Sequence, residues 1–241
     1  MKYETTHIVG VEDIGINNQM KNLAFLSCIE EIACAHSATC GYGVNDIDTK
    51  HRAWLLMDWK LKIFKRPIYN DKILIKTWAR ELGKNSYFSY RDFEIYLNDE
   101  KIAIATSKWV LFDFSENKIT KLNEEIYGPY IPENEYVFED EKINKILEPK
   151  EYQNFMTYKV SRRDIDINKH MHNLNYLTLA YEVLPDDIYF SEELKNVSIM
   201  YKHQVLLNED IKCFYSFENS THTITIKSND EKKIHAIIQL R

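Results

Sequence analysis

A fourteen-residue segment occurs twice in this chain, and its duplication constrains the fold more than any other feature of the sequence. Residues 164–177 align without a gap with residues 13–26, and eight of the fourteen positions are identical. An internal repeat of this kind indicates a duplicated structural unit. We therefore expect the 241 residues to form two domains, 1–127 and 151–241, joined by a linker over residues 128–150.

The two copies differ at the positions that matter for chemistry. The later copy has Asp166 and His170 where the earlier copy has Gly15 and Gln19. A carboxylate and an imidazole are the usual groups for moving protons in enzymes, whereas Gly and Gln are not. The sequence therefore predicts that the scaffold is present twice and a reactive site once.

The later copy leads into a predicted helix. Apolar residues recur at three- and four-residue steps from position 173 until Pro185, which is typical of a helix and its end. Asp166, Asn168 and His170 would then alternate along an extended approach, with their side chains on one side. Together with free N–H groups at the helix start, such groups can carry out acyl transfer. The alternative is that Asp and Asn only cap the helix.

Composition excludes several classes of protein. The formal net charge of −6 argues against a nucleic-acid binder, and no apolar run approaches the roughly 18 residues of a membrane span. The first residues lack the apolar core of a signal peptide, so a cytoplasmic location is expected. The four cysteines form no CxxC pair and are interpreted as reduced core residues, so neither a metal nor another cofactor is expected.

The first domain is predicted to begin with a strand over residues 2–11 and a long helix over residues 22–40. Glu31 and His36 lie five apart in that helix, which is poor spacing for one face, so we interpret them as structural or pocket-lining. Alternating and apolar patterns then predict strands at residues 54–64, 72–81, 87–98 and 101–114. The linker contains the acidic run 139–141 and one predicted helical turn at residues 143–147.

The second domain repeats this order. A strand is expected at residues 155–161, followed by the motif, its helix, and strands at residues 197–205, 210–218, 222–228 and 233–240. A strand, a long helix and an antiparallel run, twice over, predict an α+β chain of two tandem hotdog domains, in which each sheet wraps around a helix. We expect the two sheets to join edge to edge into one continuous sheet, as in a dimer of single hotdogs.

Several separated motifs resemble those of acyl-ACP thioesterases. Residues 162–176 resemble the DLDxNxHxNNxxY signature of that family, and residues 63–71 resemble its ERYPxxGD turn. Residues 105–110 resemble its ATSxWV strand, and Glu193-Leu194 with residues 201–205 resembles its EL…YRREC segment. The resemblance runs nearly from end to end and implies a double-hotdog enzyme that releases fatty acids from acyl carrier protein.

The resemblance also implies roles for individual residues. The family's catalytic Asp, Asn and His correspond to Asp166, Asn168 and His170. The plant family's cysteine corresponds to Val205 and the preceding glutamate to Gln204, so thiolate attack is excluded and Gln204 is left an assisting role. Asp166 would then either activate a water or attack the thioester itself, with the other two residues orienting the reacting groups.

Three other functions stay open at this point. The same fold could hydrolyse acyl-CoA, act as a hotdog dehydratase on 3-hydroxyacyl thioesters, or bind acyl chains without catalysis. Some acyl-binding hotdogs carry a preceding DNA-binding module, and the first predicted strand begins too near Met1 to leave room for one. Acyl chain length depends on the depth of a pocket that we expect under the helix over residues 22–40. The sequence leaves the oligomeric state open, a homodimer included.

The implied partner is acyl carrier protein, which is strongly acidic. Because this chain is itself net negative, docking would require a local group of cations beside the motif. The predicted docking residues are Arg162, Arg163, Lys169 and Lys202, with His203 beside Lys202 on the strand expected to face the motif.

Overall fold

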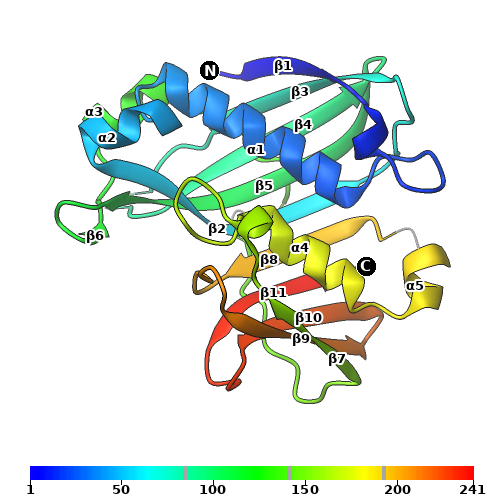
Figure 1. Ribbon diagram of the computed structural model, residues 1–241. Coiled ribbons are helices and arrows are strands. Elements are labelled where there is room, and N and C mark those ends of the chain that lie inside the picture. The colour runs from blue at the N-terminus through cyan, green and yellow to red at the C-terminus, as the bar shows by residue number, and fades with distance from the viewer. Residues whose placement is uncertain (84–85, 140–142, 192–193) are drawn as a thin grey trace. The chain divides into compact units, whose positions relative to one another are not determined.

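The computed structural model describes residues 1–83, 86–139, 143–191 and 194–241. The chain divides into two compact units, Met1–Ile143 and Asn144–Arg241 (Figure 1). Each unit consists of an antiparallel sheet and a helix that lies against one of its faces, which is the predicted hotdog arrangement. The prediction that the two sheets join edge to edge stays a prediction.

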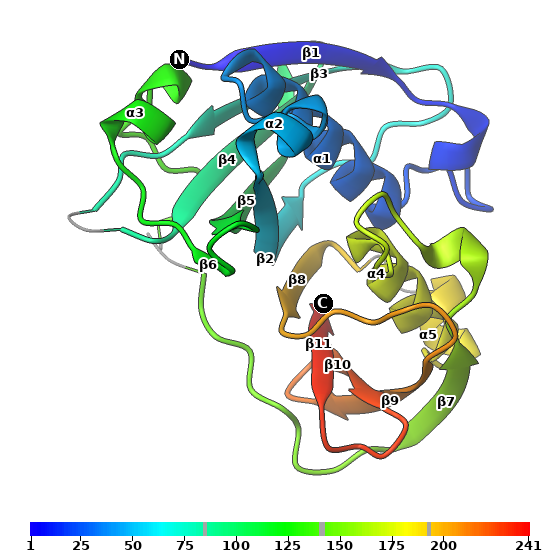
Figure 2. The same ribbon diagram turned by 60° about the vertical axis from the view of Figure 1, so that its left-hand side comes forward.

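The first unit is built around the helix α1 (Asn22–Thr39). Phe25, Ile29, Ile32 and His36 recur at three- and four-residue steps and are buried, so one stripe of the helix faces the sheet. Figures 1 and 2 show α1 lying across the sheet from both directions of view. The sheet runs in the order β1-β3-β4-β5-β2, with β6 paired to β5.

The strands of this unit match the predicted ones to within a few residues. They are β1 (Tyr3–Ile8), β2 (Arg52–Ile63), β3 (Lys72–Ala79), β4 (Ser89–Leu97) and β5 (Glu100–Asp113). The short β6 (Lys118–Ile119) was not predicted. Short helical segments that the sequence did not predict are η1 (Val11–Asp13), η2 (Val44–Asp46), α2 (Ile47–Lys50), α3 (Glu124–Tyr127) and η3 (Gly128–Tyr130).

The second unit repeats the plan on a smaller scale. Its sheet runs in the order β8-β11-β10-β9-β7, and α4 lies against it. The strands are β7 (Asn154–Lys159), β8 (Asn196–Tyr201), β9 (Asp210–Glu218), β10 (Thr221–Ser228) and β11 (Ile234–Leu240). The helical elements are η4 (Arg162–Asp164), the predicted α4 (Asn173–Glu182) and α5 (Asp186–Ser191), which the sequence did not predict.

Two predictions about this half of the chain are wrong. Residues 143–149 form no helix; instead Ile146 is buried against Met200 and Ile237, which requires the chain to lie along the sheet. β8 ends at Tyr201 rather than at residue 205, because the next two amides both donate to the carbonyl of His235 and leave the ladder. Residues 140–142, within the predicted linker and its acidic run, and Glu193 lie outside the described residues.

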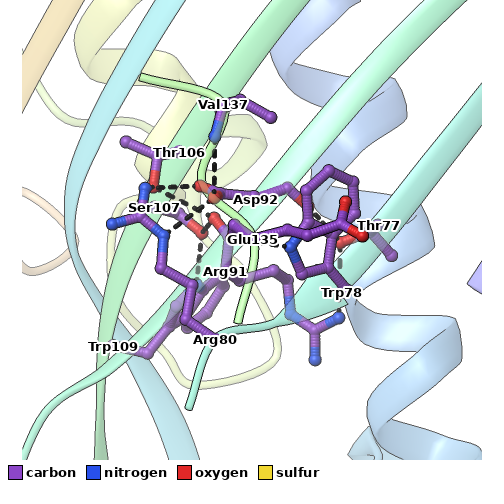
Figure 3. A network of polar contacts seen from close by, with 10 residues as sticks. All are labelled: Thr77, Trp78, Arg80, Arg91, Asp92, Thr106, Ser107, Trp109, Glu135 and Val137. Atoms are coloured by element: carbon purple, nitrogen blue, oxygen red, sulfur yellow. Dashed lines mark hydrogen bonds and ion pairs between the residues drawn. The ribbon is translucent and has the colours of Figure 1, made fainter. Parts of the chain in front are cut away.

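Residues 133–138 run from the edge of the first sheet, beside the end of β3, onto the face that is turned away from α1. Glu133 exchanges backbone hydrogen bonds with Ala79 and Glu81, and the Val137 amide donates to the carboxylate of Asp92 at 3.2 Å (Figure 3). That carboxylate also accepts two bonds from the Arg80 guanidinium, at 2.8 and 2.6 Å, and both side chains are buried. A buried ion pair therefore fastens this segment to the sheet.

In the described part of the chain, no single helix is long and apolar enough to cross a membrane. The helices over Asn22–Thr39 and Val44–Lys50 reach that length and composition as a pair bent by 46°.

The buried pair gives a prediction about stability. Replacing Asp92 by Ala should lower the free energy of unfolding by about 3–5 kcal/mol, because it leaves the buried Arg80 charge uncompensated. Urea unfolding followed by tryptophan fluorescence measures this loss. Glu116→Ala is the matched control, since its pair with Lys118 is exposed and should contribute less than about 1 kcal/mol. Similar losses in the two variants would contradict the assignment.

Candidate active site

The motif of the second unit folds into a tight hairpin rather than the extended approach predicted from the sequence. Ile165 pairs with Met171, and the Asp166 amide donates to the His170 carbonyl at 2.9 Å. Lys169 sits at the turn with a φ of 63°, in the left-handed region. The turn brings positions 166 to 170 closer together than a strand would.

The Asp166 carboxylate organises this turn. Its Oδ1 atom accepts hydrogen bonds from the backbone amides of Asn168 at 2.8 Å and His170 at 3.3 Å. Within the described residues, neither Oδ2 of Asp166 nor the side chains of Asn168 and His170 make a hydrogen bond. Asn168 is exposed and the other two are half-buried. One carboxylate oxygen, an amide and an imidazole thus remain available to a ligand at one turn.

The first unit contains the same backbone turn, but the side-chain hydrogen bonds within it differ. The Gly15 amide donates to the Gln19 carbonyl at 2.9 Å, and Asn18 has a φ of 58°, matching the later hairpin. Here Asn17 accepts from the Gln19 amide at 3.2 Å and donates through Nδ2 to the Gln19 side chain at 3.3 Å. The two side chains are therefore bonded to each other, and this turn has neither an acid nor an imidazole at the positions of Asp166 and His170.

A buried carboxylate, Asp164, holds the hairpin to the rest of the second unit. Its Oδ2 atom accepts from the Ser161 amide, the Ser161 hydroxyl and the Tyr158 hydroxyl at 2.7–2.8 Å. Burial alone would raise the pKa of Asp164, but these hydrogen bonds outweigh it and lower the pKa below the usual value. This role was not predicted from the sequence, although Asp13 occupies the same position in the earlier copy.

The start of α4 is closed by its own cap. His172 accepts the Leu174 amide on Nδ1 at 3.4 Å, and the Asn175 amide donates to the His172 carbonyl at 3.0 Å. The His172 backbone amide donates to the carbonyl of Asp164 at 2.8 Å. Two of the helix-terminal amides expected to hold an oxyanion are therefore already bonded within the cap.

Val205, at the position of the plant cysteine, has a structural role. It is fully buried, and its carbonyl accepts the Met171 amide at 2.9 Å. Gln204, predicted to assist, is exposed, and its side chain makes no hydrogen bond to the described residues. The cysteine of this unit, Cys213, is buried on β9, where burial raises its pKa to about 12. So little thiolate forms at neutral pH that Cys213 is no nucleophile.

The predicted docking cations are all exposed. Arg162 and Arg163 lie in η4, Lys169 at the tip of the hairpin, and Lys202 with His203 in the loop after β8 rather than on a strand. That loop meets the hairpin through a bridge between His170 and Leu206. We call the four residues Arg162, Arg163, Lys169 and Lys202 the cationic rim.

The first unit lacks this charge pattern. The bridge from Gln19 to Ile68 corresponds to the bridge from His170 to Leu206, which aligns the two loops as well as the two hairpins. The positions that correspond to the cationic rim are Val11, Glu12, Asn18 and Phe64. The cationic rim therefore belongs to the copy that has the acid and the imidazole.

Comparison with known proteins identifies the family. The model of the acyl-ACP thioesterase N-terminal domain matches residues 1–130, and that of the C-terminal domain matches residues 147–240. The chain belongs to the acyl-ACP thioesterase family. Among the described residues of this family member, no group of three or more His, Cys, Asp or Glu side chains is placed to hold a metal ion.

Individual relatives agree with this assignment. An oleoyl-acyl carrier protein thioesterase of Arabidopsis thaliana is 24% identical over 92% of this chain, which spans 65% of that relative's length. An acyl-ACP thioesterase from Bacteroides thetaiotaomicron has a TM-score of 0.86 at 17% identity, with 99% of this chain and 96% of that chain covered. A 12:0-ACP thioesterase from Umbellularia californica has a TM-score of 0.88 at 16% identity, with 100% and 96% covered. These likenesses show the double-hotdog fold.

The network around Asp164 gives a prediction about stability and pH. Asp164→Ala should lower the free energy of unfolding at pH 7 by about 2–3 kcal/mol, because it removes hydrogen bonds to a buried charge. Since its pKa is lowered on folding, this contribution is complete above the ordinary Asp pKa of about 3.9 and is lost as pH falls through the lower folded value. Urea unfolding of both proteins at pH 7 and below pH 4 measures the difference.

The matched control is Asp230→Ala, because Asp230 accepts similar hydrogen bonds from Ser228 and Lys232 at an exposed site. That variant should lose less than about 1 kcal/mol. If the loss caused by Asp164→Ala stayed constant with pH, the ionised carboxylate would not be the stabilising form.

Proposed function

We propose that this chain hydrolyses the thioester of fatty acyl–acyl carrier protein to a free fatty acid and the carrier thiol. The observation that carries the proposal is the duplicated turn, of which a single copy presents a carboxylate oxygen, an amide and an imidazole unused by the fold. Membership of the acyl-ACP thioesterase family supports the reaction class. A cytoplasmic location stays a prediction from the sequence, and the Arabidopsis relative is named as chloroplastic.

Asp166 is the reacting carboxylate in this proposal. Because Oδ1 is held by two backbone amides, Oδ2 is the oxygen with a fixed position and no partner among the described residues. In one route Oδ2 takes a proton from water as the water oxygen attacks the thioester carbonyl. In the other, Oδ2 attacks that carbonyl to form an anhydride, which water then opens. In both, the carbon–sulfur bond breaks and the sulfur leaves as a thiol after protonation.

Asn168 and His170 orient the reacting groups. The amide of Asn168 can donate to the thioester oxygen as negative charge develops there, and the imidazole of His170 can hold the water or protonate the leaving sulfur. A single turnover in ¹⁸O-labelled water tests for the anhydride. Label in the Asp166 carboxyl group, read by mass spectrometry of the peptide, would show an anhydride that water opens at the aspartyl carbon. Label in the fatty acid alone is the result of the general-base route and of an anhydride opened at its acyl carbon.

The partner we propose is acyl carrier protein, docked on the cationic rim. Arg163 is 81% exposed and contacts Asp164 at 3.9 Å, too far for a strong bond, so its charge remains available. Ile167 and Leu206 are exposed beside the rim, which adds apolar contact area. An acidic carrier would be attracted to this copy of the turn rather than to the first, where Glu12 replaces Arg163.

The duplicated turn predicts how substitutions should act on activity. Asp166→Asn and His170→Ala should each lower the turnover number on acyl-ACP by about 10²–10⁴-fold, as expected for general acid–base groups. The Asp166→Asn protein should stay folded, since the oxygen of the new Asn side chain can still accept the two backbone hydrogen bonds that Oδ1 of Asp166 accepts. Thiol release from a panel of acyl-ACPs of increasing chain length measures the rate and tests the proposed substrate.

Gln19→Ala is the matched control, because Gln19 occupies the position of His170 in the first turn. Its turnover should stay within about twofold of wild type, as no proton transfer is assigned to that turn. Equal losses from the Gln19 and His170 variants would sink the one-site proposal. Faster turnover of acyl-CoA than of acyl-ACP at equal chain length would favour the acyl-CoA alternative.

The cationic rim predicts a salt-dependent Michaelis constant. Reversing Arg163 and Lys169 to Glu should raise the Michaelis constant for acyl-ACP at least about tenfold at low salt, while a small acyl-thioester surrogate is hydrolysed at an unchanged rate. Because exposed charges are screened over about 10 Å at 0.1 M salt, the difference should shrink as salt is added.

The matched control reverses Lys145 and Lys150, two exposed lysines of the same unit, with the same change in net charge. Lys150 lies beside Asn219 at the β9–β10 turn, away from the hairpin. This variant should keep the Michaelis constant of wild type. If both charge reversals raise the Michaelis constant for acyl-ACP equally, or if hydrolysis of the small surrogate falls along with that of acyl-ACP, the carrier docks elsewhere.

A further inference from the structure

Residues 202–206 follow β8 and hold the hairpin of the second unit, and we call them the supporting loop. The Val205 carbonyl accepts the Met171 amide at 2.9 Å, and Leu206 forms a bridge with His170. The position of His170 therefore depends on the supporting loop as well as on its own turn.

The first unit has a corresponding loop over residues 64–68. Its Pro67 carbonyl accepts the Met20 amide at 2.9 Å, and Ile68 forms a bridge with Gln19. The backbone contact between loop and hairpin is therefore the same in both units. Any difference in how the two loops are held must come from their other contacts.

The first two residues of each loop are tied to a neighbouring strand. In the first unit their amides donate to the Ile102 carbonyl on β5, at 2.7 and 3.2 Å. In the second unit they donate to the His235 carbonyl on β11, which lies beside β8 (Figure 1), at 2.8 and 3.3 Å. The two loops thus match residue by residue, and His235 occupies the position of Ile102.

The first loop has two restraints that the supporting loop does not share. The Arg66 guanidinium donates to the Met20 carbonyl at 2.6 Å and to the side chain of the first residue of α1 at 2.7 Å. Its counterpart is Gln204, which is exposed and whose side chain makes no hydrogen bond to the described residues. Pro67, whose ring fixes the backbone φ, has Val205 as its counterpart. The supporting loop therefore needs another means of being held.

The side chain of His235 supplies a restraint of a different kind. Its Nδ1 atom bonds to the His203 carbonyl at 3.1 Å, and the residue is 2% exposed. Because a carbonyl can only accept, Nδ1 carries the hydrogen. Burial lowers the pKa of His235, although this bond and the Glu209 carboxylate act in the opposite direction, so the ring is uncharged at neutral pH. The alkyl side chain of Ile102 could not make such a bond.

This hydrogen bond acts close to the residues that contact the hairpin, because Val205 and Leu206 follow His203 almost directly. Without it, the supporting loop could move relative to β11, and His170 would move with the loop. A displacement of about 1 Å at a reacting group can lower a rate about 10²-fold.

We propose that His235 is a positioning residue for the hairpin, acting through its hydrogen bond to the His203 carbonyl. It touches neither the substrate nor the reacting atoms. It holds the supporting loop from the side of β11, so that Val205 and Leu206 keep His170 in one place. The inference rests on the proposed hydrolysis, in which His170 takes part.

Three substitutions separate the hydrogen bond of His235 from the bulk of its ring. His235→Asn keeps a donor near the position of Nδ1, His235→Gln moves the donor toward the position of Nε2, and His235→Ile reproduces the first unit. The turnover number on a small acyl-thioester surrogate should fall about tenfold or more in His235→Gln and His235→Ile, and stay within about threefold of wild type in His235→Asn. The Michaelis constant for the surrogate should not change, because His235 does not contact it.

Hydrogen exchange of the Met171 amide gives a measurement that does not require catalysis. This amide is bonded to the Val205 carbonyl, so a looser supporting loop should expose it more often. Its exchange should be about tenfold faster in His235→Gln and His235→Ile, and unchanged in His235→Asn. The matched control is Arg66→Gln, which should speed exchange of the Met20 amide while leaving both turnover and exchange of Met171 as in wild type.

Equal turnover losses in His235→Asn and His235→Ile would overturn the proposal, because the ring would then matter only for packing. Faster exchange of Met171 with wild-type turnover would also overturn it, since the hydrogen bond would then have a structural role alone. If His235→Ile does not fold, His235→Gln carries the same comparison. A wild-type protein that hydrolyses no thioester would instead overturn the proposed function, whereas exchange of Met171 would still show whether His235 holds the hairpin.

Discussion

In both units a carboxylate fastens the end of the first strand to the hairpin that precedes the long helix. Asp13 accepts the Gly10 amide at 2.8 Å and contacts His7 at 2.7 Å, while Asp164 accepts the Ser161 amide and the Tyr158 hydroxyl. The two sets correspond residue by residue. Strand, hairpin and helix are therefore held in the same relation twice, and the position of every group on the hairpin depends on this anchor.

The two hairpins differ in how they satisfy their backbone amides. In the first hairpin, the side-chain oxygen of Asn17 accepts a hydrogen bond from the Gln19 backbone amide, and the side-chain amide of Asn17 donates to the Gln19 side chain. In the second hairpin, the Asp166 carboxylate accepts hydrogen bonds from the backbone amides of Asn168 and His170. The side chains of these two residues are therefore not needed to stabilise the turn. Replacing a glycine by an aspartate thus does two things at once: it supplies an acid, and it leaves the neighbouring polar groups available.

The sequence predicted the secondary structure well where periodicity is strong. The helix over residues 22–39 and the strands of both sheets follow from apolar residues repeated at the right spacing. The geometry of the motif could not be predicted in this way, because alternation assumes a continuous strand and the turn depends on the left-handed backbone of Lys169. The end of β8 and the extended chain at Ile146 depend on contacts with distant residues, His235 and Ile237, which no local pattern reveals.

The buried charges were also invisible to pattern reasoning. Arg80 follows β3 and Arg91 lies within β4, two strands that mix apolar with polar and charged residues, and nothing local distinguishes the guanidinium that meets a carboxylate from the one that meets the neutral imidazole of His36. The repeat, in contrast, identified Asp166, Asn168 and His170 as the differing positions before any contact was known. Comparing two copies within one chain extracts information that a single copy does not contain.

The satisfied turn of the first unit has an evolutionary consequence. Selection for a reactive turn works against stability, because it keeps polar groups without internal partners. A gene that doubles such a fold can divide the labour: one half keeps the costly arrangement, and the other is free to drift toward a self-contained one. In the first half of this chain, Asn17 and Gln19 bond to each other, so that turn carries less of this thermodynamic cost than the turn of the second half.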